Sequence, residues 1–394
     1  VEPPQAGTAE ITQGDLAQAG GSAPVGWYLK FTPDPDYSGT ARVGYRLVSA
    51  LGTSNTGVIA FTLAYDPDAV VGKTHALVQG FVQSRLGMIA SNIKVPGLVE
   101  RRAMGSADAR VSTSFSPSES AMVMNFATSL AQMEAARIGQ AGIVEAPDMP
   151  FNAWIDGTFM LHSRSQNNER WGSFAMLSAG MDYLLTDKIL VGLAFHYDRM
   201  ADPTDGKNTL AGNGWLLGPY ASLEIGSGVY WDSSVFFGGS ANTIDMLAWN
   251  GGFDTSRWLV DTALKGQWRL DEATVLTPRL RLVYLSETVE GYAITNSAGD
   301  VLSLQGFTTE QLRIGLGAAL ARAFTLENGV IFTPSLDVDL GITPLNGMGY
   351  FGALAPGVSW RHPDAWTIDG RLLLNIDSSG ALAVGVKGGI RGGF

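Results

Sequence analysis

The end of the chain alternates strictly between two kinds of side chain. One face carries apolar residues and glycines: Leu382, Val384, Val386, Gly388, Ile390, Gly392 and Phe394. The other face carries small or charged residues: Ala383, Gly385, Lys387, Gly389, Arg391 and Gly393. Side chains of a β-strand point alternately to opposite faces, so this period predicts a final strand with one apolar face. We expect it to pair with the first strand of a closed sheet in lipid, because closure removes both unpaired edges.

The composition agrees with a sheet that crosses a membrane. Charged residues are 16% of the chain, against about 25% in ordinary soluble domains. Hydrophobic residues are 45%, and glycine contributes 49 of 394 residues. No apolar run reaches the ~18–20 residues of a transmembrane helix. A chain of this kind fits a transmembrane β-barrel, in which each strand turns only alternate residues to lipid.

Charge and cysteine content exclude several classes of function. The net charge of −11 argues against nucleic acid as a partner. The chain contains no cysteine, so no disulfide framework is expected. The residues that follow Val1 show no charged n-region and no apolar h-region, so we expect a mature form or a fragment whose signal peptide lay upstream.

Residues 151–394 read as twelve long alternating segments, which predicts a mainly β protein with a 12-stranded antiparallel transmembrane barrel. The segments are 151–163, 171–185, 189–199, 212–225, 229–242, 253–269, 274–290, 308–324, 329–343, 350–361, 366–377 and 381–394. Tight connections, as at 186–188 and 226–228, alternate with mostly longer polar ones, as at 200–211 and 291–307. Short turns on one rim and long loops on the outer rim are typical of outer-membrane barrels. Such a barrel closes within one chain, so we expect a monomer.

The two faces of each segment can be sorted into lipid and lumen. In 189–199 the odd positions are apolar and the even positions small or polar. Tryptophan and tyrosine near the segment ends suit the two interfacial girdles. A charge on the lipid side would cost about 2–4 kcal/mol near the midplane, so the charged residues are expected in the lumen. The predicted lumen-lining residues are Asp182, Glu224, Asp232, Asp261, Lys265, Arg269, Arg279, Arg281, Glu287, Arg313, Asp337, Asp339, Asp369, Arg371, Lys387 and Arg391.

Residues 66–150 change to helical spacing and predict two helices. Asp66 can cap the first, with Pro67 at its first position, and Pro96-Gly97 ends it. The second is predicted over 119–138, after the capping box that begins at Ser116. Twenty residues make about 30 Å of helix, one membrane thickness. Its apolar stripe consists of Met122, Phe126, Leu130 and Met133.

Residues 1–65 read as a small β module. Strand-like stretches at 27–32, 41–48 and 57–65 are separated by turn residues. The run Phe31-Thr32-Pro33, the run Tyr37-Ser38-Gly39-Thr40 and the alternating strand 58–63 resemble bacterial Ig-like or cadherin-like surface repeats. The resemblance implies a partial Ig-like module at the cell surface. Asp34-Pro35-Asp36 offers too few oxygen ligands for calcium, and a solvated turn is the favoured interpretation.

The order helix, linker, twelve-strand barrel and terminal phenylalanine resembles the translocator of a type Va autotransporter. Local matches include Asn152-Ala153-Trp154-Ile155-Asp156-Gly157 and Leu217-Gly218-Pro219-Tyr220, and the resemblance covers roughly residues 66–394. It implies an outer-membrane protein of a Gram-negative bacterium that exports and anchors its own N-terminal passenger. It also implies outer-membrane lipid and the barrel assembly machinery as partners, with Phe394, Ile390 and Val386 as the C-terminal assembly signal. In that family a helix before the first strand fills the pore, and we assign this role to 119–138.

Alternatives to a translocator remain open. The barrel can instead be a plain anchor for an adhesin or envelope tether, without an active role in secretion. An enzyme is disfavoured, because lumen lining explains Asp337-x-Asp339, and His162 and His196 accompany no nucleophile motif. We therefore predict no catalytic residues, no metal ligands and no cofactor.

Overall fold

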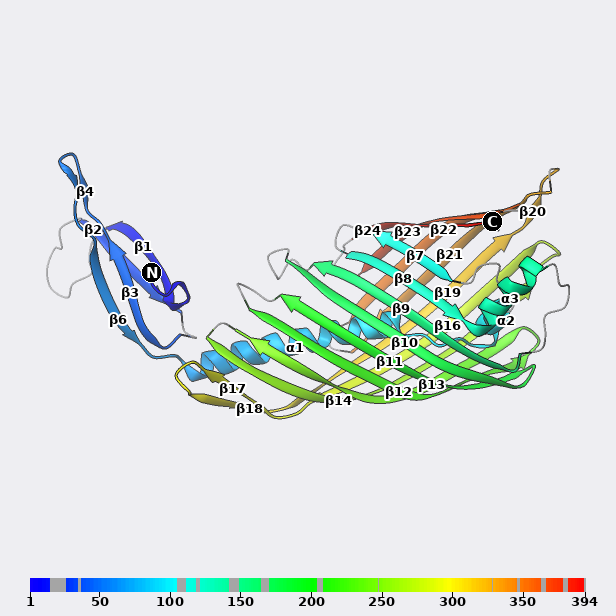
Figure 1. Ribbon diagram of the computed structural model, residues 1–394, viewed down its shortest axis with the longest axis horizontal. Helices are drawn as coiled ribbons and strands as arrows, with labels where there is room; N and C mark the ends of the chain where they lie inside the picture. The colour runs from blue at the N-terminus through cyan, green and yellow to red at the C-terminus, as the bar shows by residue number, and fades with distance from the viewer. Residues whose placement is uncertain are drawn as a thin grey trace.

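The computed structural model describes residues 1–14, 26–34, 37–104, 111–117, 121–141, 149–163, 170–203, 208–246, 248–327, 329–345, 348–362, 366–377 and 382–392. Most of these residues form one antiparallel sheet that closes into a barrel, drawn in cyan to red in Figure 1. The fold is mainly β, as the alternation predicts.

Each of the twelve segments expected as strands is a strand of this sheet. The strands are β9 (Phe151–Ser163), β10 (Trp171–Thr186), β11 (Ile189–Pro203), β12 (Thr209–Gly226), β13 (Val229–Asp245), β14 (Trp249–Gly266), β16 (Thr274–Val289), β19 (Phe307–Arg322), β21 (Ile331–Thr343), β22 (Gly349–Arg361), β23 (Trp366–Asp377) and β24 (Leu382–Gly392). The two-residue strands β15 (Trp268–Arg269) and β20 (Phe324–Thr325) pair with β16 and β21. Consecutive long strands pair as antiparallel neighbours around the wall.

A hairpin from the predicted linker also enters the wall, which corrects two expectations. Strands β7 (Ser112–Pro117) and β8 (Ala121–Ser129) lie between β24 and β9 in the ring. The expected count of twelve is therefore not met among the described residues, and the helix predicted over 119–138 is wrong. Residues 121–129 are extended and pair with β9, and only α3 (Leu130–Ala141) is helical.

The rims differ as the connection lengths predict. The β10–β11 and β12–β13 connections are two-residue turns, the second containing Gly228 at φ 67°. At the opposite rim, residues 291–307 are not a plain loop, because β17 (Tyr292–Asn296) and β18 (Val301–Leu304) form a hairpin there. Strand β17 also pairs with the start of β14, so the wall extends further on this side.

The long helix of the molecule is α1 (Pro67–Asn92), and it lies inside the barrel (Figure 1). Asp66 caps it as predicted, because its carboxylate accepts hydrogen bonds from the backbone N–H of Asp68 at 3.0 Å and Ala69 at 3.3 Å. The helix ends where Ile93 becomes extended, three residues before Pro96. A short helix, α2 (Leu98–Met104), follows near the rim with the tight turns.

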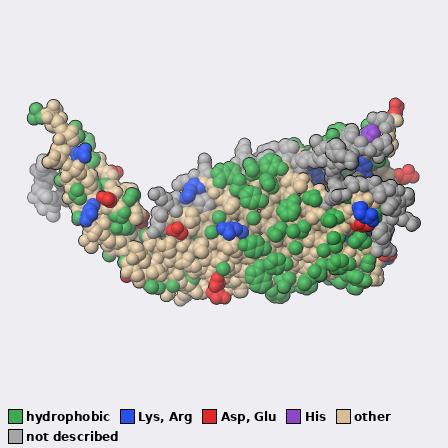
Figure 2. All heavy atoms as spheres, in the orientation of Figure 1, with side chains coloured by type: hydrophobic (Ala, Val, Ile, Leu, Met, Phe, Trp, Pro, Cys, Tyr) green, Lys and Arg blue, Asp and Glu red, His purple; other side chains and the backbone are tan. Residues whose placement is uncertain are grey.

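The outer wall is apolar. Leu193, Phe195 and Leu264 are more than 40% exposed, whereas Leu190 and Leu259 on the alternate faces are fully buried. Figure 2 shows hydrophobic side chains gathered over the wall on the face in view. The sorting into lipid and lumen faces follows this pattern. None of the described helices is long and apolar enough to span a membrane.

The N-terminal residues form three two-stranded pairs outside the barrel: β1 (Gly7–Gly14) with β2 (Gly26–Pro33), β3 (Gly39–Tyr45) with β6 (Gly57–Leu63), and β4 (Val48–Ser49) with β5 (Gly52–Thr53). The rings of Phe31 and Phe61 stack between the first two pairs, with centroids 4.7 Å apart. Figure 1 places these strands beyond the start of α1. Their Ig-like identity stays a prediction.

Candidate functional site: the plugged lumen

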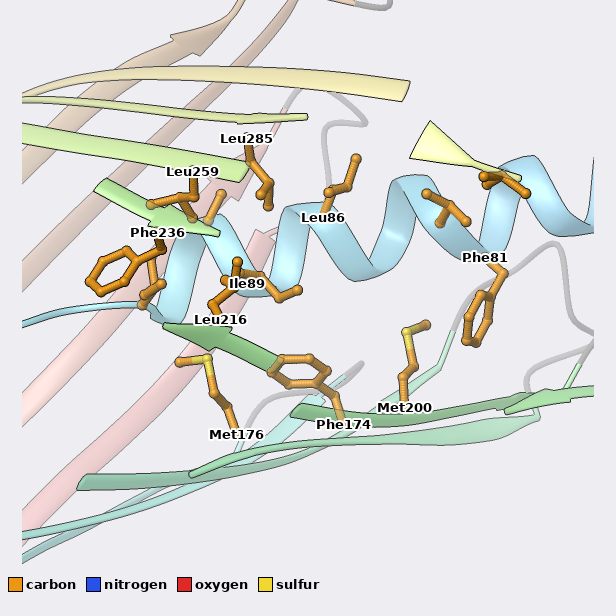
Figure 3. Packing of buried hydrophobic residues seen from close by; sticks show 14 of the residues in the cluster. Phe81, Leu86, Ile89, Phe174, Met176, Met200, Leu216, Phe236, Leu259 and Leu285 are labelled. Atoms are coloured by element: carbon orange, nitrogen blue, oxygen red, sulfur yellow. The ribbon is translucent and has the colours of Figure 1, made fainter. Parts of the chain in front are cut away.

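Apolar side chains hold α1 against the barrel wall. Phe81, Leu86 and Ile89 are at most 1% exposed, and they belong to one buried cluster with residues of β10 to β16. Figure 3 shows them facing wall residues, which are Phe174, Met176, Met200, Leu216, Phe236, Leu259 and Leu285. Each fully buried side chain of this size contributes about 1.5–3 kcal/mol by leaving water. The wall therefore packs on this helix as a core packs in a soluble protein.

A buried ionic network fixes the middle of α1. Arg85 has a side-chain exposure of 1%, and its Nε donates to Asp198 at 2.5 Å. Its Nη1 donates to the amide oxygen of Asn242 at 2.7 Å. Arg257 of β14 also donates to Asp198, at 2.7 Å, and to Glu287 at 3.1 Å. Two arginines and two carboxylates thus balance in charge, and the guanidinium of α1 is bonded to two wall strands.

The second helix closes the lumen at the rim with the tight turns. Arg101 of α2 donates to Asp182 at 3.0 Å and to the backbone oxygen of Met149 at 2.7 Å. Glu100 accepts from Lys265 at 2.5 Å. Gly97 precedes the helix, and a Cβ there would lie 2.6 Å from the carboxylate of Asp232, so only glycine allows this close approach. Removing α1 alone would leave α2 bonded to the wall.

Arg102 reaches the turn itself. Its guanidinium donates to Glu224 at 2.8 Å, to the hydroxyl of Tyr230 at 2.7 Å and to the backbone oxygen of Asp187 at 2.7 Å. The hydrogen bond to Glu224 is the main reason that the pKa of Arg102 lies above its usual value. Arg102 therefore stays charged at neutral pH.

The wall formed by β19, β21 and β22 carries charges and small residues instead of a packed core. Arg279 of β16 reaches across β19 to Asp337 and Asp339 of β21. The crossing passes over Gly317, where a Cβ would lie 2.1 Å from Asp339 Oδ1. Nearby, Arg281 binds Asp261 at 2.7 Å and donates to the backbone oxygen of Ile93 at 2.6 Å. Apart from Arg313, the charges described here pair with one another, and Arg281 reaches α1 only at its C-terminal end.

The structure brings most of the predicted lumen residues together, but not all of them. Eleven have ion-pair partners within 4 Å: Asp182, Glu224, Asp232, Asp261, Lys265, Arg279, Arg281, Glu287, Asp337, Asp339 and Arg371. Arg371 lies 3.8 Å from Asp337, and Arg313 stacks on Phe351. Arg269 is exposed on β15, where it pairs with Val275, and its assignment to the lumen stays a prediction. The side chains of Asp369, Lys387, Arg391, Val386 and Ile390, and all of Phe394, lie outside the described residues.

The predicted pore-helix residues do not lie in the pore. Met122 and Phe126 are on β8 and are 38% and 42% exposed, and Leu130 and Met133 are exposed on α3. The helix in the lumen is α1, the upstream one. The sequence analysis did not single out three buried arginines that hold the helices and the wall together: Arg85 of α1, Arg101 of α2 and Arg257 of β14. The available signal was Arg85 itself, a charge within the stripe that runs from Phe81 to Ile89.

Comparisons with known proteins found one family match and several similar solved structures. Residues 156–342 match the family model described as the autotransporter beta-domain. Similar solved structures include the beta domain of the Bordetella autotransporter BrkA, with 16% identity, a TM-score of 0.42 and coverage of 62% of this chain and 100% of that one. The translocator domain of NalP from Neisseria meningitidis has 13% identity, a TM-score of 0.41 and coverage of 82% and 96%. The monoaromatic hydrocarbon channel CymD has 10% identity, a TM-score of 0.42 and coverage of 71% and 86%.

No curated protein shows significant similarity to the whole sequence. The family match covers the wall from β9 to β21, which includes Asp198, Arg257 and Glu287 of the network around α1. Over residues 156–342, just under half of the chain, the barrel is therefore similar in sequence to the autotransporter beta-domain.

Proposed function

We propose that the chain exports an N-terminal passenger through the outer membrane and then anchors it at the cell surface. The observation that supports this is the position of α1, which runs through the lumen and connects residues 1–65 to the opposite rim. A barrel whose lumen already contains its own chain has the arrangement that a completed export event would leave. The proposal assigns no chemistry and no cofactor to the chain.

The contacts of α1 give the direction of the chain. Tyr65 packs on Trp249, with ring centroids 4.9 Å apart, and Thr74 contacts Met246 next to the long-connection rim. After α2, Arg102 contacts Asp187 in a tight turn at the other rim. Long loops face outward in outer-membrane barrels, so the N-terminal segment lies outside the cell and α2 at the periplasmic side.

This direction assigns a role to each part. Residues 1–65 are the surface module, residues 66–150 contain the plug and the added hairpin, and residues 151–394 form the rest of the barrel. The partners are outer-membrane lipid on the apolar wall, the barrel assembly machinery and the passenger itself. A single chain closes the ring, which supports a monomer.

A static anchor for an adhesin or envelope tether is the second candidate. The buried pair of Arg85 and Asp198 favours it, because a helix bonded to two wall strands does not leave the lumen easily. The two candidates differ in whether the barrel carries an unrelated N-terminal cargo to the surface. A fused reporter tests this difference, since a translocator displays it and a plain anchor does not.

Single cysteines test the orientation, because the chain has none of its own. Leu51→Cys lies in the N-terminal segment and Leu270→Cys lies in the tight turn before β16, and both side chains are well exposed. A membrane-impermeant maleimide applied to intact cells should label the first at once and the second only after the outer membrane is opened. Labelling of Leu270→Cys on intact cells, with Leu51→Cys protected, would overturn the proposal.

A further inference from the structure

The lumen contains a cavity that α1 does not fill. It has a volume of about 820 Å3 and lies beside the C-terminal end of the helix. One side is lined by the chain that follows α1, including Lys94 and Glu100, and the other by β16, β19, β21 and β22. Arg279, Arg281 and Arg313 all face it. The cavity is thus a charged space inside an otherwise packed barrel.

All but one of the cations around this cavity have a carboxylate partner. Lys94 binds Asp156 at 3.1 Å, and Lys265 binds Asp232 at 2.8 Å. Arg281 and Arg279 are occupied by Asp261 and by Asp337 with Asp339, as described above. Within the described part of the chain, no carboxylate lies at ion-pair distance from Arg313. A charge at membrane depth without a counter-ion is costly, and it marks a functional site by default.

Arg313 is held in a fixed orientation without being neutralised. Its Cζ lies 3.3 Å from the centroid of the Phe351 ring, which stacks on one face of the guanidinium. Phe351 can lie there because Gly341 beside it has no side chain, and a Cβ at Gly341 would be 2.0 Å from the ring. The stacked guanidinium keeps its in-plane N–H donors available, which is the geometry that binds carboxylate and phosphate by two parallel hydrogen bonds.

A second arginine, already paired with Asp261, lies close to Arg313. Arg281 pairs in register with Gly315, two residues beyond Arg313 on the same face of β19. Diagonal neighbours across a strand pair are within reach of long side chains. The carboxylate of Asp339, which also lines the cavity, is engaged by Nε and Nη2 of Arg279.

We propose that Arg313, stacked on Phe351, binds a small oxyanion in this cavity. The shared chemistry is a planar or tetrahedral group with two adjacent oxygens, supplied either by inorganic phosphate or by a carboxylate. Oxyanion binding does not depend on export. A protein that binds no oxyanion can still be a translocator, and a protein that exports no passenger can still bind an oxyanion.

Isothermal titration of the purified full-length chain in detergent tests the proposal, with inorganic phosphate and acetate as separate probes at low chloride. We expect saturable 1:1 binding of at least one probe, and the probe that binds identifies the source. Arg313→Gln should weaken binding at least tenfold. Arg322→Gln is the matched control, because Arg322 lies on the same strand, 52% exposed and paired with Asp271 outside the cavity.

Two further variants keep the test decisive if Arg313→Gln does not fold. Arg313→Lys keeps the charge but loses the planar fork, so it should bind severalfold more weakly than the wild type. Phe351→Leu removes the stacking surface and should also weaken binding. The proposal is overturned if neither probe saturates the wild-type protein, or if the Arg313 variants bind as tightly as Arg322→Gln.

Discussion

Two parts of the barrel wall present different kinds of side chain to the lumen. On β10 to β14 the inward positions carry large buried side chains, such as Phe174, Met200 and Phe236, which pack on α1. On β19 to β22 the positions that line the cavity are charged or small, with the ring of Phe351 as the large exception. Both walls obey the same alternation on their lipid faces. The difference shows that the residue types on the lumen face depend on what fills the barrel, whereas those on the lipid face depend on the membrane.

The largest expected effect comes from emptying the packed side. Deleting residues 1–104 removes α1 and α2 but keeps the hairpin β7–β8 in the wall, so the barrel can still close. Single-channel recording in planar bilayers should show a nearly closed full-length protein and a stable open pore after the deletion. Deleting only residues 1–65 is the matched control, and it should remain nearly closed. If the 1–104 deletion is equally closed, the wall side chains alone fill the lumen and α1 is no plug.

The next effect concerns the buried network on the packed side. Arg257→Ala leaves Asp198 and Glu287 without one partner at a site where the arginine side chain has no exposure. Removing one member of a buried ionic group costs about 3–5 kcal/mol, because the remaining charges lie uncompensated in a low dielectric. Urea unfolding in lipid vesicles, extrapolated linearly to water, measures the change. If the free energy of unfolding falls by less than about 1 kcal/mol, water enters the network and the ion pairs of the two walls are equally solvated.

The ion pair between Arg85 of α1 and Asp198 of the wall should give a measurable coupling energy. Arg85→Ala, Asp198→Ala and the double variant form a cycle, because the two side chains contact each other at 2.5 Å. Residues in direct contact usually couple by about 0.5–3 kcal/mol, and we expect a value in this range. The same variants should open more often in planar bilayers than the wild type. Additive free energies with unchanged opening would show that apolar packing alone retains α1.

The strands and the first helix cap could be predicted because their signals are local. The period of two fixes which residues of 189–199 face lipid, and the pair Asp66-Pro67 fixes the start of α1. Both signals act within a few residues and depend little on distant partners.

The identity of the pore helix could not be predicted by the same logic. Met122 and Phe126 are four residues apart, a spacing that places them on one face of a helix and also on one face of a strand. Met124, 49% exposed beside them, reveals the period of two, but pairing with β9 decides the outcome. Arg257 was missed for a similar reason, because its partners come from β11 and β16 and are far away in sequence.

The smallest effect should come from the open wall, and it tests the comparison most directly. Arg279→Ala breaks the pairs with Asp337 and Asp339, yet the arginine side chain is 25% exposed to the cavity. Water can hydrate the two carboxylates when the arginine is removed, so the loss should be at most about 1 kcal/mol, as for solvated ion pairs. The urea experiment used for Arg257→Ala measures both under identical conditions. If Arg279→Ala lowers the free energy of unfolding as much as Arg257→Ala does, the cavity is not filled with water. The two walls would then differ only in shape.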